Sequence, residues 1–488
     1  MDLIDRINQW GKLVPQRAAH ISAGRSVTYQ QLLEGSDSLA SHLIRSLPDD
    51  HSPVAILGHK ESEMLVGFLG CVKARHPYIP LDSSLPSQRI EIITKTAKAS
   101  LLLTAEDISK IIDKERSSPV EIRKSALNDA WYIIFTSGST GDPKGVVITR
   151  QCLESFVEWI LGEQKFKDKN EVYLNQAPFS FDLSVMDLYS SLATGGTLFS
   201  ITKDEIAELK VLYKAFANSD ISVWVSTPSF ARMCLMDPSF DESMLPLARK
   251  FWFCGETLAP DVAANLIKRF PKAEVWNTYG PTEATVATTS IRITEEIISR
   301  YAALPVGRAK PDTLVEVHDR DGEPVPAGER GEIIIAGPNV SVGYIHRPDL
   351  TSRSFFEVEG MRAYHTGDSG HYQDGLLFFD GRMDFQIKLH GYRIEIGDIE
   401  ANLHALNNVQ DAVVTPAMKD GQADHLVAFI IFKEKPAASD FETMKQMKKD
   451  LGERLPDYMV PRRFIFLPEF PITTNGKADR RKLAEKIQ

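Results

Sequence analysis

Short apolar runs alternate with longer amphipathic segments along residues 1–380. The short runs have the length of buried strands and include Val54–Leu57, Tyr78–Leu81, Leu101–Thr104 and Val223–Val225. The longer segments repeat apolar residues at helical spacing and include Ile4–Trp10, Glu61–Arg75 and Cys152–Leu161. This alternation predicts an α/β architecture.

The pattern changes twice in the second half of the chain. From about Val306, Leu314–Val317, Asp319–Gly322 and Gly331–Ile335 follow one another as strand, turn and strand, which predicts a β-rich subdomain with hairpins. The second change lies near Gly381. After it the pattern predicts a small α+β domain, with a boundary at 383–385, helices at Ile399–Leu406 and Phe441–Leu455, and strands at Ala412–Thr415 and Leu426–Phe432.

Length and composition limit the class of protein. The chain has 488 residues, 43% of them apolar, which is too long for one core and predicts at least two domains. The formal net charge of −10 argues against a nucleic-acid partner. The N-terminus lacks the features of a signal peptide, and no apolar run reaches the length of a membrane span. The cysteines are far apart and indicate reduced thiols in a cytoplasmic protein: Cys71, Cys152, Cys234 and Cys254.

One loop carries the strongest chemical signal. The apolar run Tyr132–Phe135 leads into Thr136–Val146, which is rich in Gly, Ser and Thr and contains Lys144. Such a loop can turn backbone N–H groups and hydroxyls toward phosphate oxygens, with the lysine as a counter-charge. It is not a Walker A loop, because Pro143 and Gly145 occupy positions where that motif needs Gly and Ser or Thr. A flexible linker is the alternative, but linkers rarely follow a buried strand.

A second motif, Asn277–Glu283, follows the predicted strand Ala273–Trp276. Tyr279 offers an aromatic face to a base, Thr282 can donate to a phosphate, and Glu283 suits Mg²⁺. An ordinary Gly-Pro turn before a capped helix is an equally good reading of this motif by itself.

Three further polar positions are candidates for a nucleotide site. Asp368 ends Tyr364–Asp368 and could accept from ribose hydroxyls, while Arg382 ends Phe379–Arg382 and could reach the ribose or a phosphate. Lys477 follows a Gly turn near the C-terminus, where a solvated lysine in a basic tail is the alternative.

These motifs together resemble those of the adenylate-forming superfamily, which includes acyl-CoA synthetases, luciferases and the adenylation domains of nonribosomal peptide synthetases. The motifs occur in the order of that superfamily: Thr136–Val146, Asn277–Glu283, Tyr364–Asp368, Gly381–Lys388, Gly391–Glu400 and Asn475–Lys477. The resemblance implies a large domain of two α/β lobes and a β-rich subdomain at 1–383, and a mobile α+β lid at 384–488 with its hinge at Asp384.

The same resemblance implies ATP and Mg²⁺ as cofactors. It assigns ATP binding to Thr136, Ser137, Gly138, Ser139, Thr140, Lys144, Asn277, Thr278, Tyr279, Gly280, Pro281, Thr282, Asp368, Phe379, Asp380, Gly381, Arg382 and Lys477. Glu283 would be the metal ligand. Lys477 would bridge the substrate carboxylate and the α-phosphate, and Lys144 would hold the leaving pyrophosphate.

The segment containing Asp182 indicates which acid is activated. Asp182 lies among apolar residues, where a lone carboxylate is costly to bury, and the ammonium of an amino acid would offset that cost. A helix-capping aspartate on the surface is the alternative. Other positions that match the substrate pocket of the superfamily are uncharged and predict a small apolar amino acid: Leu183, Met186, Ser229, Trp252, Cys254, Thr278, Val286 and Ala287.

The whole pocket resembles that of the D-alanine–D-alanyl carrier protein ligases of Gram-positive bacteria. This implies formation of D-alanyl-AMP and transfer to the phosphopantetheine thiol of a small acidic carrier protein, the first step of lipoteichoic acid D-alanylation. The preference for D-alanine over L-alanine rests on this resemblance, because Cys254 is equally well an ordinary buried thiol.

Other functions stay open at this point. A stand-alone enzyme could load another small amino acid onto a peptide-synthetase carrier. A nucleotide-binding protein without turnover is disfavoured by the joint presence of Lys144, Glu283, Asp368 and Lys477. A luciferase-like oxidase is disfavoured because Asp182 indicates an amino-acid substrate. A non-enzymatic scaffold is disfavoured because the sequence has no interaction repeats.

Overall fold

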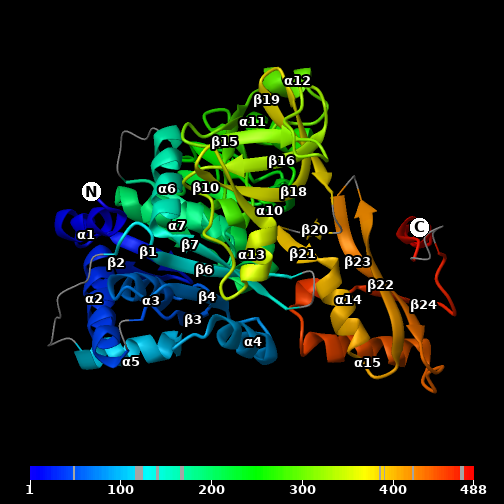
Figure 1. Ribbon diagram of the computed structural model, residues 1–488. Helices are drawn as coiled ribbons and strands as arrows, with labels where there is room; N and C mark the ends of the chain where they lie inside the picture. Colours follow the sequence, from blue (N-terminus) through cyan, green and yellow to red (C-terminus); the bar gives the residue numbers. More distant parts are fainter. Residues whose placement is uncertain are drawn as a thin grey trace. The chain divides into compact units, whose positions relative to one another are not determined.

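The computed structural model of the chain describes residues 1–47, 50–115, 125–138, 142–164, 170–383, 386–389, 391–419, 422–472 and 478–487. The chain forms two compact units. The first comprises Met1–Ser83, Thr96–Ile134 and Gly145–Met383, and the second comprises Ser84–Lys95, Phe135–Lys144 and Asp384–Gln488. Figure 1 shows the elements of both units.

The largest sheet of the first unit has the strand order β14-β13-β12-β11-β10-β8-β9-β1-β2. Its inner strands pair in parallel, whereas β1–β2, β12–β13 and β13–β14 pair antiparallel at the edges. The bounds are β1 Ala18–Ser22, β2 Arg25–Thr28, β8 Val172–Asn175, β9 Thr197–Ser200, β10 Val223–Ser226, β11 Lys250–Phe253, β12 Glu274–Tyr279, β13 Thr289–Ile293 and β14 Arg308–Ala309.

Both faces of this sheet are covered, as a parallel sheet requires. Side chains alternate between the faces, so Val225 and Trp252 join the cluster around α7, whereas Trp224 and Phe253 join the cluster under α9, α10 and α11. Every residue of α7 from Leu183 to Ala193 is buried, which is typical of a helix enclosed by the fold. The helix bounds are α7 Leu183–Thr194, α9 Leu209–Ala217, α10 Pro228–Leu235 and α11 Pro260–Arg269.

A second sheet of the chain has the order β5-β3-β4-β6-β7. Its strands are β3 Val54–Gly58, β4 Tyr78–Asp82, β5 Leu101–Thr104, β6 Ala130–Thr136 and β7 Lys144–Thr149. Helices α2 Tyr29–Ser46, α3 Ser62–Lys73 and α5 Ala105–Glu115 form a layer against it (Figure 1). The remaining helices of the first unit are α1 Leu3–Leu13, α6 Arg150–Gln164, α8 Lys203–Ala207, α12 Glu295–Arg300 and α13 Pro348–Ser354.

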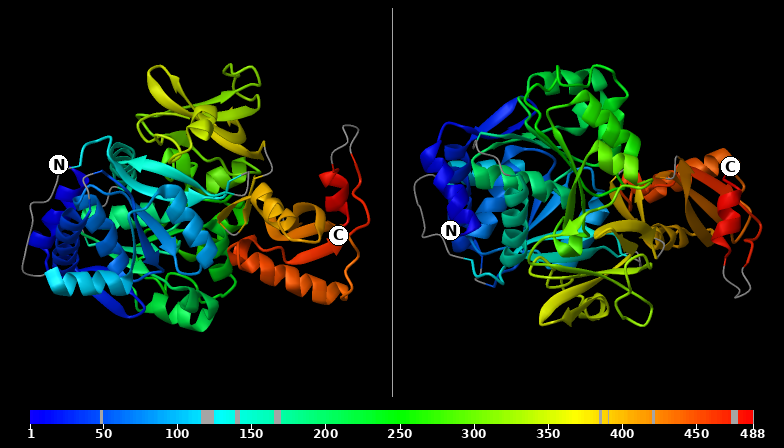
Figure 2. Two further views of the ribbon diagram at one scale, coloured as in Figure 1. Left: turned by 60° about the horizontal axis from the view of Figure 1, so that its bottom comes forward. Right: turned by 90° about the horizontal axis from the view of Figure 1, so that it is seen from above.

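The last part of the first unit is an antiparallel sheet of order β15-β16-β18-β17, in which β19 also pairs with β18. It is drawn in yellow-green to yellow in Figure 2. Its strands are β15 Leu314–His318, β16 Gly331–Ala336, β17 Phe355–Val358, β18 Met361–Gln373 and β19 Leu376–Arg382. The predicted β-rich subdomain after Val306 is therefore present.

The second unit is built around a three-stranded sheet of order β22-β23-β24. One face packs against α14 and α15, and the other packs against α16 (Figure 1). Neighbouring residues of β22 illustrate this, because Val414 joins the first cluster and Val413 the second. The bounds are β20 Gln386–Leu389, β21 Tyr392–Glu395, β22 Val409–Lys419, β23 Gln422–Phe432, β24 Arg463–Phe466, α14 Ile396–His404, α15 Asp440–Gly452 and α16 Arg480–Glu485.

Two segments that the sequence places in the large domain belong to the second unit. Most of α4, Ser87–Ala97, joins it, and Arg89 of this helix forms a 2.9 Å ion pair with Asp398 of α14 in which both side chains are buried. Burial raises the pKa of Asp398, and the Arg89 guanidinium opposes that shift. The predicted α/β fold class, with a smaller α+β unit after the β-rich sheet, is confirmed.

Candidate functional site

The Gly/Ser/Thr-rich loop begins where β6 ends. Thr136 is the last residue of that strand, and its buried hydroxyl has no hydrogen-bond partner among the described residues. A Cβ atom at Gly138 would lie 2.0 Å from the carbonyl oxygen of Asp142, so only glycine fits there. Lys144 begins β7. An orphaned buried hydroxyl two residues before such a close backbone approach suits a ligand oxygen.

The hydroxyl of Ser137, a predicted phosphate ligand, has hydrogen-bond partners within the chain. Its hydroxyl donates to the carbonyl of Arg393 at 3.1 Å and accepts the backbone N–H of Glu395 at 2.9 Å. Both partners belong to β21, in the Gly391–Glu400 motif. Two of the predicted motifs thus meet within the second unit, through a side chain that is already engaged.

Glu283 is the most enclosed carboxylate of the predicted site, with an exposed fraction of 0%. Tyr344 donates its hydroxyl to Glu283 Oε1 at 2.8 Å, and the N–H of Ser341 donates to the Glu283 carbonyl at 2.8 Å. Asn339 contacts the two residues that follow Glu283. Its side-chain amide donates to the Ala284 carbonyl, and its backbone carbonyl accepts from the Thr285 hydroxyl. The segment 339–344 therefore braces the predicted metal ligand.

The sequence analysis missed this bracing segment. Asn339 and Ser341 are fully buried polar residues that follow the apolar strand β16. Two polar residues around Val340, shortly after an apolar strand, are the signal that could have identified it, because buried polar side chains need defined partners.

The backbone after Glu283 is strained. Thr285 and Val286 have φ angles of 56° and 69°, a region that non-glycine residues, and β-branched ones above all, rarely adopt. Val286 is buried, and Cys254 donates its thiol to the Val286 carbonyl at 3.4 Å. Two of the predicted substrate-pocket positions therefore touch at a strained turn, and strain of this kind clusters at functional sites.

Tyr279, Asp368 and Arg382 form one hydrogen-bonded group, in which Tyr279 and Asp368 are buried and Arg382 is partly buried. The Tyr279 hydroxyl donates to Asp368 Oδ2 at 2.6 Å, and Arg382 Nη1 donates to Asp368 Oδ1 at 2.8 Å. The ring of Phe379 lies 5.9 Å from that of Tyr279. Burial, followed by the Asp368 charge, holds the pKa of Tyr279 well above its ordinary value, so the phenol stays a donor. The Asp380 carboxylate is not part of this group; it contacts His371 Nδ1 and forms an ion pair with Arg330.

Other predicted nucleotide-binding positions have structural partners. The Asn277 amide donates to the Pro305 carbonyl, and the Thr278 hydroxyl donates to the Phe253 carbonyl, both at 2.8 Å. A Cβ at Gly280 would lie 2.6 Å from Ala287 Cα, so glycine is required for close packing there. Thr282 is buried beside Glu283. Pro281 precedes the short 3₁₀ helix that contains Thr282, and Gly381 has a φ of 122°.

Asp182 stands at the start of α7, and it is partly buried. Its side chain makes no capping hydrogen bond with the helix. After burial, the Asp182 charge is the largest effect that raises the pKa of Tyr132 well above its ordinary value. The Tyr132 hydroxyl is itself buried and lacks a partner in the described part of the chain. The helix-capping alternative therefore has no hydrogen bond to support it.

Most of the predicted substrate-pocket positions share one apolar cluster. It contains Leu183, Met186, Trp252, Cys254, Val286 and Ala287. The polar position Ser229 donates its hydroxyl and its N–H to the Glu256 carboxylate. Trp252 is fully buried and stacked on Trp276, with ring centroids 4.8 Å apart.

Four predicted residues lie outside the described residues: Lys477, the hinge Asp384, Ser139 and Thr140. Their roles stay predictions. The four cysteines are buried, and none of them forms a disulfide bond. Within the described ranges, no three His, Cys, Asp or Glu side chains group as a metal site. No helix in that part of the chain is long and apolar enough to cross a membrane.

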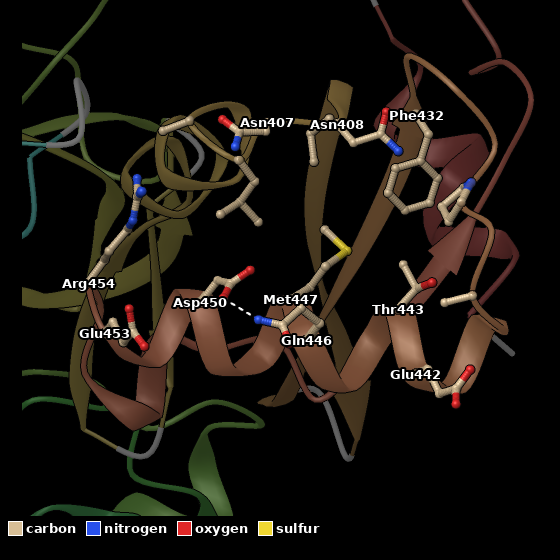
Figure 3. Close-up of a pocket in the computed structure, with 15 residues that line it drawn as sticks. Asn407, Asn408, Phe432, Glu442, Thr443, Gln446, Met447, Asp450, Glu453 and Arg454 are labelled. Carbon is tan, nitrogen blue, oxygen red and sulfur yellow. Dashed lines mark hydrogen bonds between the residues drawn. The ribbon is translucent and has the colours of Figure 1, made fainter.

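The second unit contains a pocket of about 670 Å³ beside α15 (Figure 3). Met447, Leu406 and Phe432 contribute apolar walls, and the acids outnumber the single arginine Arg454. The acids are Glu442, Asp450 and Glu453. None of the predicted site residues lines this pocket, so it is separate from the candidate site.

The fold and the site define the class of protein. Residues 7–345 match the family of AMP-binding enzymes, and residues 398–477 match the AMP-binding enzyme C-terminal domain. The chain belongs to the AMP-binding enzyme family, which confirms the predicted resemblance to adenylate-forming enzymes.

Named relatives narrow the comparison. The chain is 47% identical, over all of both chains, to the D-alanine–D-alanyl carrier protein ligases of Bacillus cereus (strain B4264) and Bacillus thuringiensis (strain Al Hakam). A Vibrio cholerae adenylation domain in complex with glycyl-adenosine-5'-phosphate matches with a TM-score of 0.85 and 22% identity, over 99% of this chain and 97% of that one. An amide bond synthetase from Marinactinospora thermotolerans matches with a TM-score of 0.86 and 20% identity, over 100% and 99%.

Proposed function

We propose that this chain is an ATP-dependent ligase that activates D-alanine as D-alanyl-AMP and passes the D-alanyl group to the phosphopantetheine thiol of a small carrier protein. Full-length identity of 47% to ligases of that name supports the reaction. The observation that carries the choice of substrate is the partly buried Asp182, which directly precedes Leu183 of the apolar core cluster. A carboxylate beside apolar walls fits a small amino acid with a positive α-ammonium group.

In the first half-reaction, a carboxylate oxygen of D-alanine attacks the α-phosphorus of ATP. The bond from that phosphorus to the bridging oxygen breaks, and pyrophosphate leaves with the electron pair. Since the substrate carboxylate is already ionised, no general base is needed. The protein contributes positioning and charge neutralisation.

The roles of the nucleotide site follow from its polar groups. Asp368 would accept from the ribose hydroxyls, with Tyr279 and Arg382 holding its two oxygens in place. The Thr136 hydroxyl, the backbone at Gly138 and the Lys144 ammonium would receive the phosphates. Lys477 would bridge the alanine carboxylate and the α-phosphate.

Glu283 fits a magnesium ion. It is a buried carboxylate whose orientation is fixed by Tyr344, and Mg²⁺ in nucleotide sites is commonly held by one or two carboxylates together with phosphate oxygens. A bound Mg²⁺ would supply positive charge to the phosphates. The bracing by the segment 339–344 keeps the Glu283 carboxylate in one place for that purpose.

In the second half-reaction, the pantetheine sulfur attacks the carbonyl carbon of D-alanyl-AMP. The bond from that carbon to the AMP oxygen breaks, and AMP leaves.

We propose that the lid, 384–488, rotates about Asp384 between the two half-reactions. The last 48 residues hold 11 Lys and Arg against 7 Asp and Glu, which suits an acidic carrier. The pocket beside α15 is acidic, so it does not suit an acidic carrier. We place this chemistry in the cytoplasm, at the start of lipoteichoic acid D-alanylation.

Pyrophosphate exchange tests the choice of substrate. The purified chain is assayed with ATP and, in separate reactions, with D-alanine, L-alanine, glycine, serine and proline. We expect D-alanine to give the highest kcat/KM. Highest exchange with another of these amino acids would instead indicate a stand-alone enzyme that loads a peptide-synthetase carrier.

A further inference from the structure

We infer that Lys60, a residue in the turn between β3 and α3, is a positioning residue for the amino-acid site, because it holds the segment that ends in Asp182. The inference rests on the proposed function, in which Asp182 binds the substrate ammonium. Lys60 is itself 2% exposed and surrounded by protein, so it acts on the substrate through its neighbours.

The Lys60 ammonium contacts three successive points of one segment. It donates to the side-chain oxygen of Asn175 and to the carbonyl of Ala177. It also lies 4.8 Å from the ring centroid of Phe179, in the geometry of a cation–π contact. Asn175 is the last residue of β8, and α7 begins directly after Asp182. These contacts therefore fasten the connection between β8 and α7 at its beginning.

The other end of the connection is tied to the same group. The Asn175 amide donates to Asp187 Oδ1 at 3.0 Å, and Asp187 lies in the second turn of α7. The negative charge of Asp187 is the largest favourable influence on the Lys60 ammonium. The second oxygen of Asp187 is buried without a hydrogen-bond partner among the described residues, so its pairing depends on Asn175 and on the Lys60 charge.

This cluster is buried and electrostatically coupled. Burial lowers the pKa of Lys60 to about 7 and raises that of Asp187. Asp82 also favours the charge on Lys60, and Lys203 opposes it. His20 belongs to the same network, because its Nε2 lies 2.9 Å from the hydroxyl of Ser200. That hydroxyl donates to the side-chain oxygen of Asn175.

Removal of the ammonium would take one donor from the Asn175 oxygen and one from the Ala177 carbonyl, which keep the Ser200 hydroxyl and the Asn175 amide as partners. It would also take away the largest favourable charge near the buried Asp187 carboxylate. A buried carboxylate without its opposite charge is costly, so the connection would shift toward other partners or water. Because Asp182 lies at the end of that connection, a shift of about 1 Å there would weaken binding of the amino acid by roughly tenfold or more. The Tyr279–Asp368–Arg382 group has no contact with Lys60, so binding of ATP should be unaffected.

The test compares Lys60→Met with a matched control, Lys73→Met. Lys73 is equally buried, and its ammonium also has two acceptors, Ser36 at 2.8 Å and Asp37 at 2.7 Å, but these lie on α2. In pyrophosphate exchange we expect K60M to raise the KM for D-alanine roughly tenfold or more, with the KM for ATP within about twofold of wild type. K73M should leave both constants near wild type. Equal KM values for D-alanine in K60M and K73M would overturn the inference.

A second variant covers the case in which K60M does not fold. Phe179→Leu keeps the lysine and removes the ring beneath it, and it should raise the KM for D-alanine in the same direction by less. An unchanged KM in F179L, with K60M insoluble, would also overturn the inference. If the wild-type protein catalyses pyrophosphate exchange with a different amino acid, the proposed substrate is refuted but the role of Lys60 is not. The KM values of K60M, K73M and wild type are then compared for that amino acid.

Discussion

Tyr344 donates its hydroxyl to the Glu283 carboxylate at 2.8 Å, and both side chains are buried. The two residues are 61 positions apart in sequence. The contact belongs to the braced turn in which Ser341 and Asn339 hold the backbone of the neighbouring residues. A carboxylate held in this way is oriented before any ligand binds, which reduces the cost of binding a cation.

Substitution of Tyr344 by Phe should therefore weaken the response to magnesium. The loss of an outer partner of a metal ligand typically costs about 10- to 100-fold in metal affinity. We expect the Mg²⁺ concentration that gives half-maximal pyrophosphate exchange to rise by about tenfold, with the maximal rate largely recovered at high Mg²⁺. Tyr372→Phe is the control, because its hydroxyl donates to Val315 within the antiparallel sheet. Identical Mg²⁺ dependence in the two variants would contradict the role of Tyr344.

Asp182 is expected to select the amino acid by charge. Asp182→Asn keeps the shape of the side chain and removes the charge that faces the ammonium. Truncation of a desolvated, hydrogen-bonded charge pair costs about 2–5 kcal/mol, so kcat/KM for D-alanine should fall by roughly 10²-fold or more. The KM for ATP should change little.

Propionate, which is alanine without its amino group, gives the matching substrate control for Asp182. It cannot use the negative charge, so D182N should narrow the gap between D-alanine and propionate. Asp261→Asn, on an exposed aspartate paired with Arg232, should behave as wild type. A gap of undiminished size in D182N would show that the ammonium binds elsewhere.

The sequence predicted the fold well because each element depends on local pattern. The strands at Val54–Gly58 and Val223–Ser226 and the helix at Ser62–Lys73 all lie where apolar periodicity indicated them. The Gly-rich loop after β6 was predicted from its composition, and the close approach of Gly138 to the Asp142 carbonyl explains why glycine stands at that position. The pocket positions on α7 and β11 were predicted by resemblance to the family; the structure places them in one apolar core cluster, and their role in binding the substrate stays a prediction.

The missed features all depend on contacts between distant parts of the chain. The hydrogen bond from Tyr344 to Glu283 joins residues that are 61 positions apart. The contacts of Lys60 with the β8–α7 connection join residues that are more than 100 positions apart. No local pattern encodes such pairs. The hydrogen bond from Ser229 to Glu256, 27 positions away, could not be predicted from the sequence for the same reason, and the predicted substrate-pocket role of Ser229 stays a prediction.

Acid should destabilise the first unit through His20. Burial, and then the Lys60 charge, lowers the pKa of His20 from 6.5 to about 3. The unfolded chain therefore binds this proton more tightly than the folded chain does, so the contribution is complete above pH 6.5 and is lost as pH falls toward 3. Between these limits this single group should lower the free energy of unfolding by about 1.4 kcal/mol per pH unit.

Denaturant unfolding at pH 7, 6, 5 and 4.5 measures this effect. His20→Gln should reduce the pH slope of the free energy of unfolding by about one proton. His42→Gln is the control, since His42 is only partly buried and lies beside Glu115. An unchanged slope in H20Q would contradict the assignment of a buried, neutral His20.

The central claim is that this chain forms D-alanyl-AMP and delivers the D-alanyl group to a thiol. The most direct test is intact-mass measurement of a phosphopantetheinylated carrier protein after incubation with the purified chain, ATP, Mg²⁺ and D-alanine. We predict that the carrier gains the mass of one alanyl residue, that hydroxylamine removes it, and that one AMP is released for each residue transferred. A carrier of unchanged mass, while the same protein forms an adenylate with D-alanine, would contradict the transfer step; no adenylate and no transfer with any small amino acid would contradict the whole account.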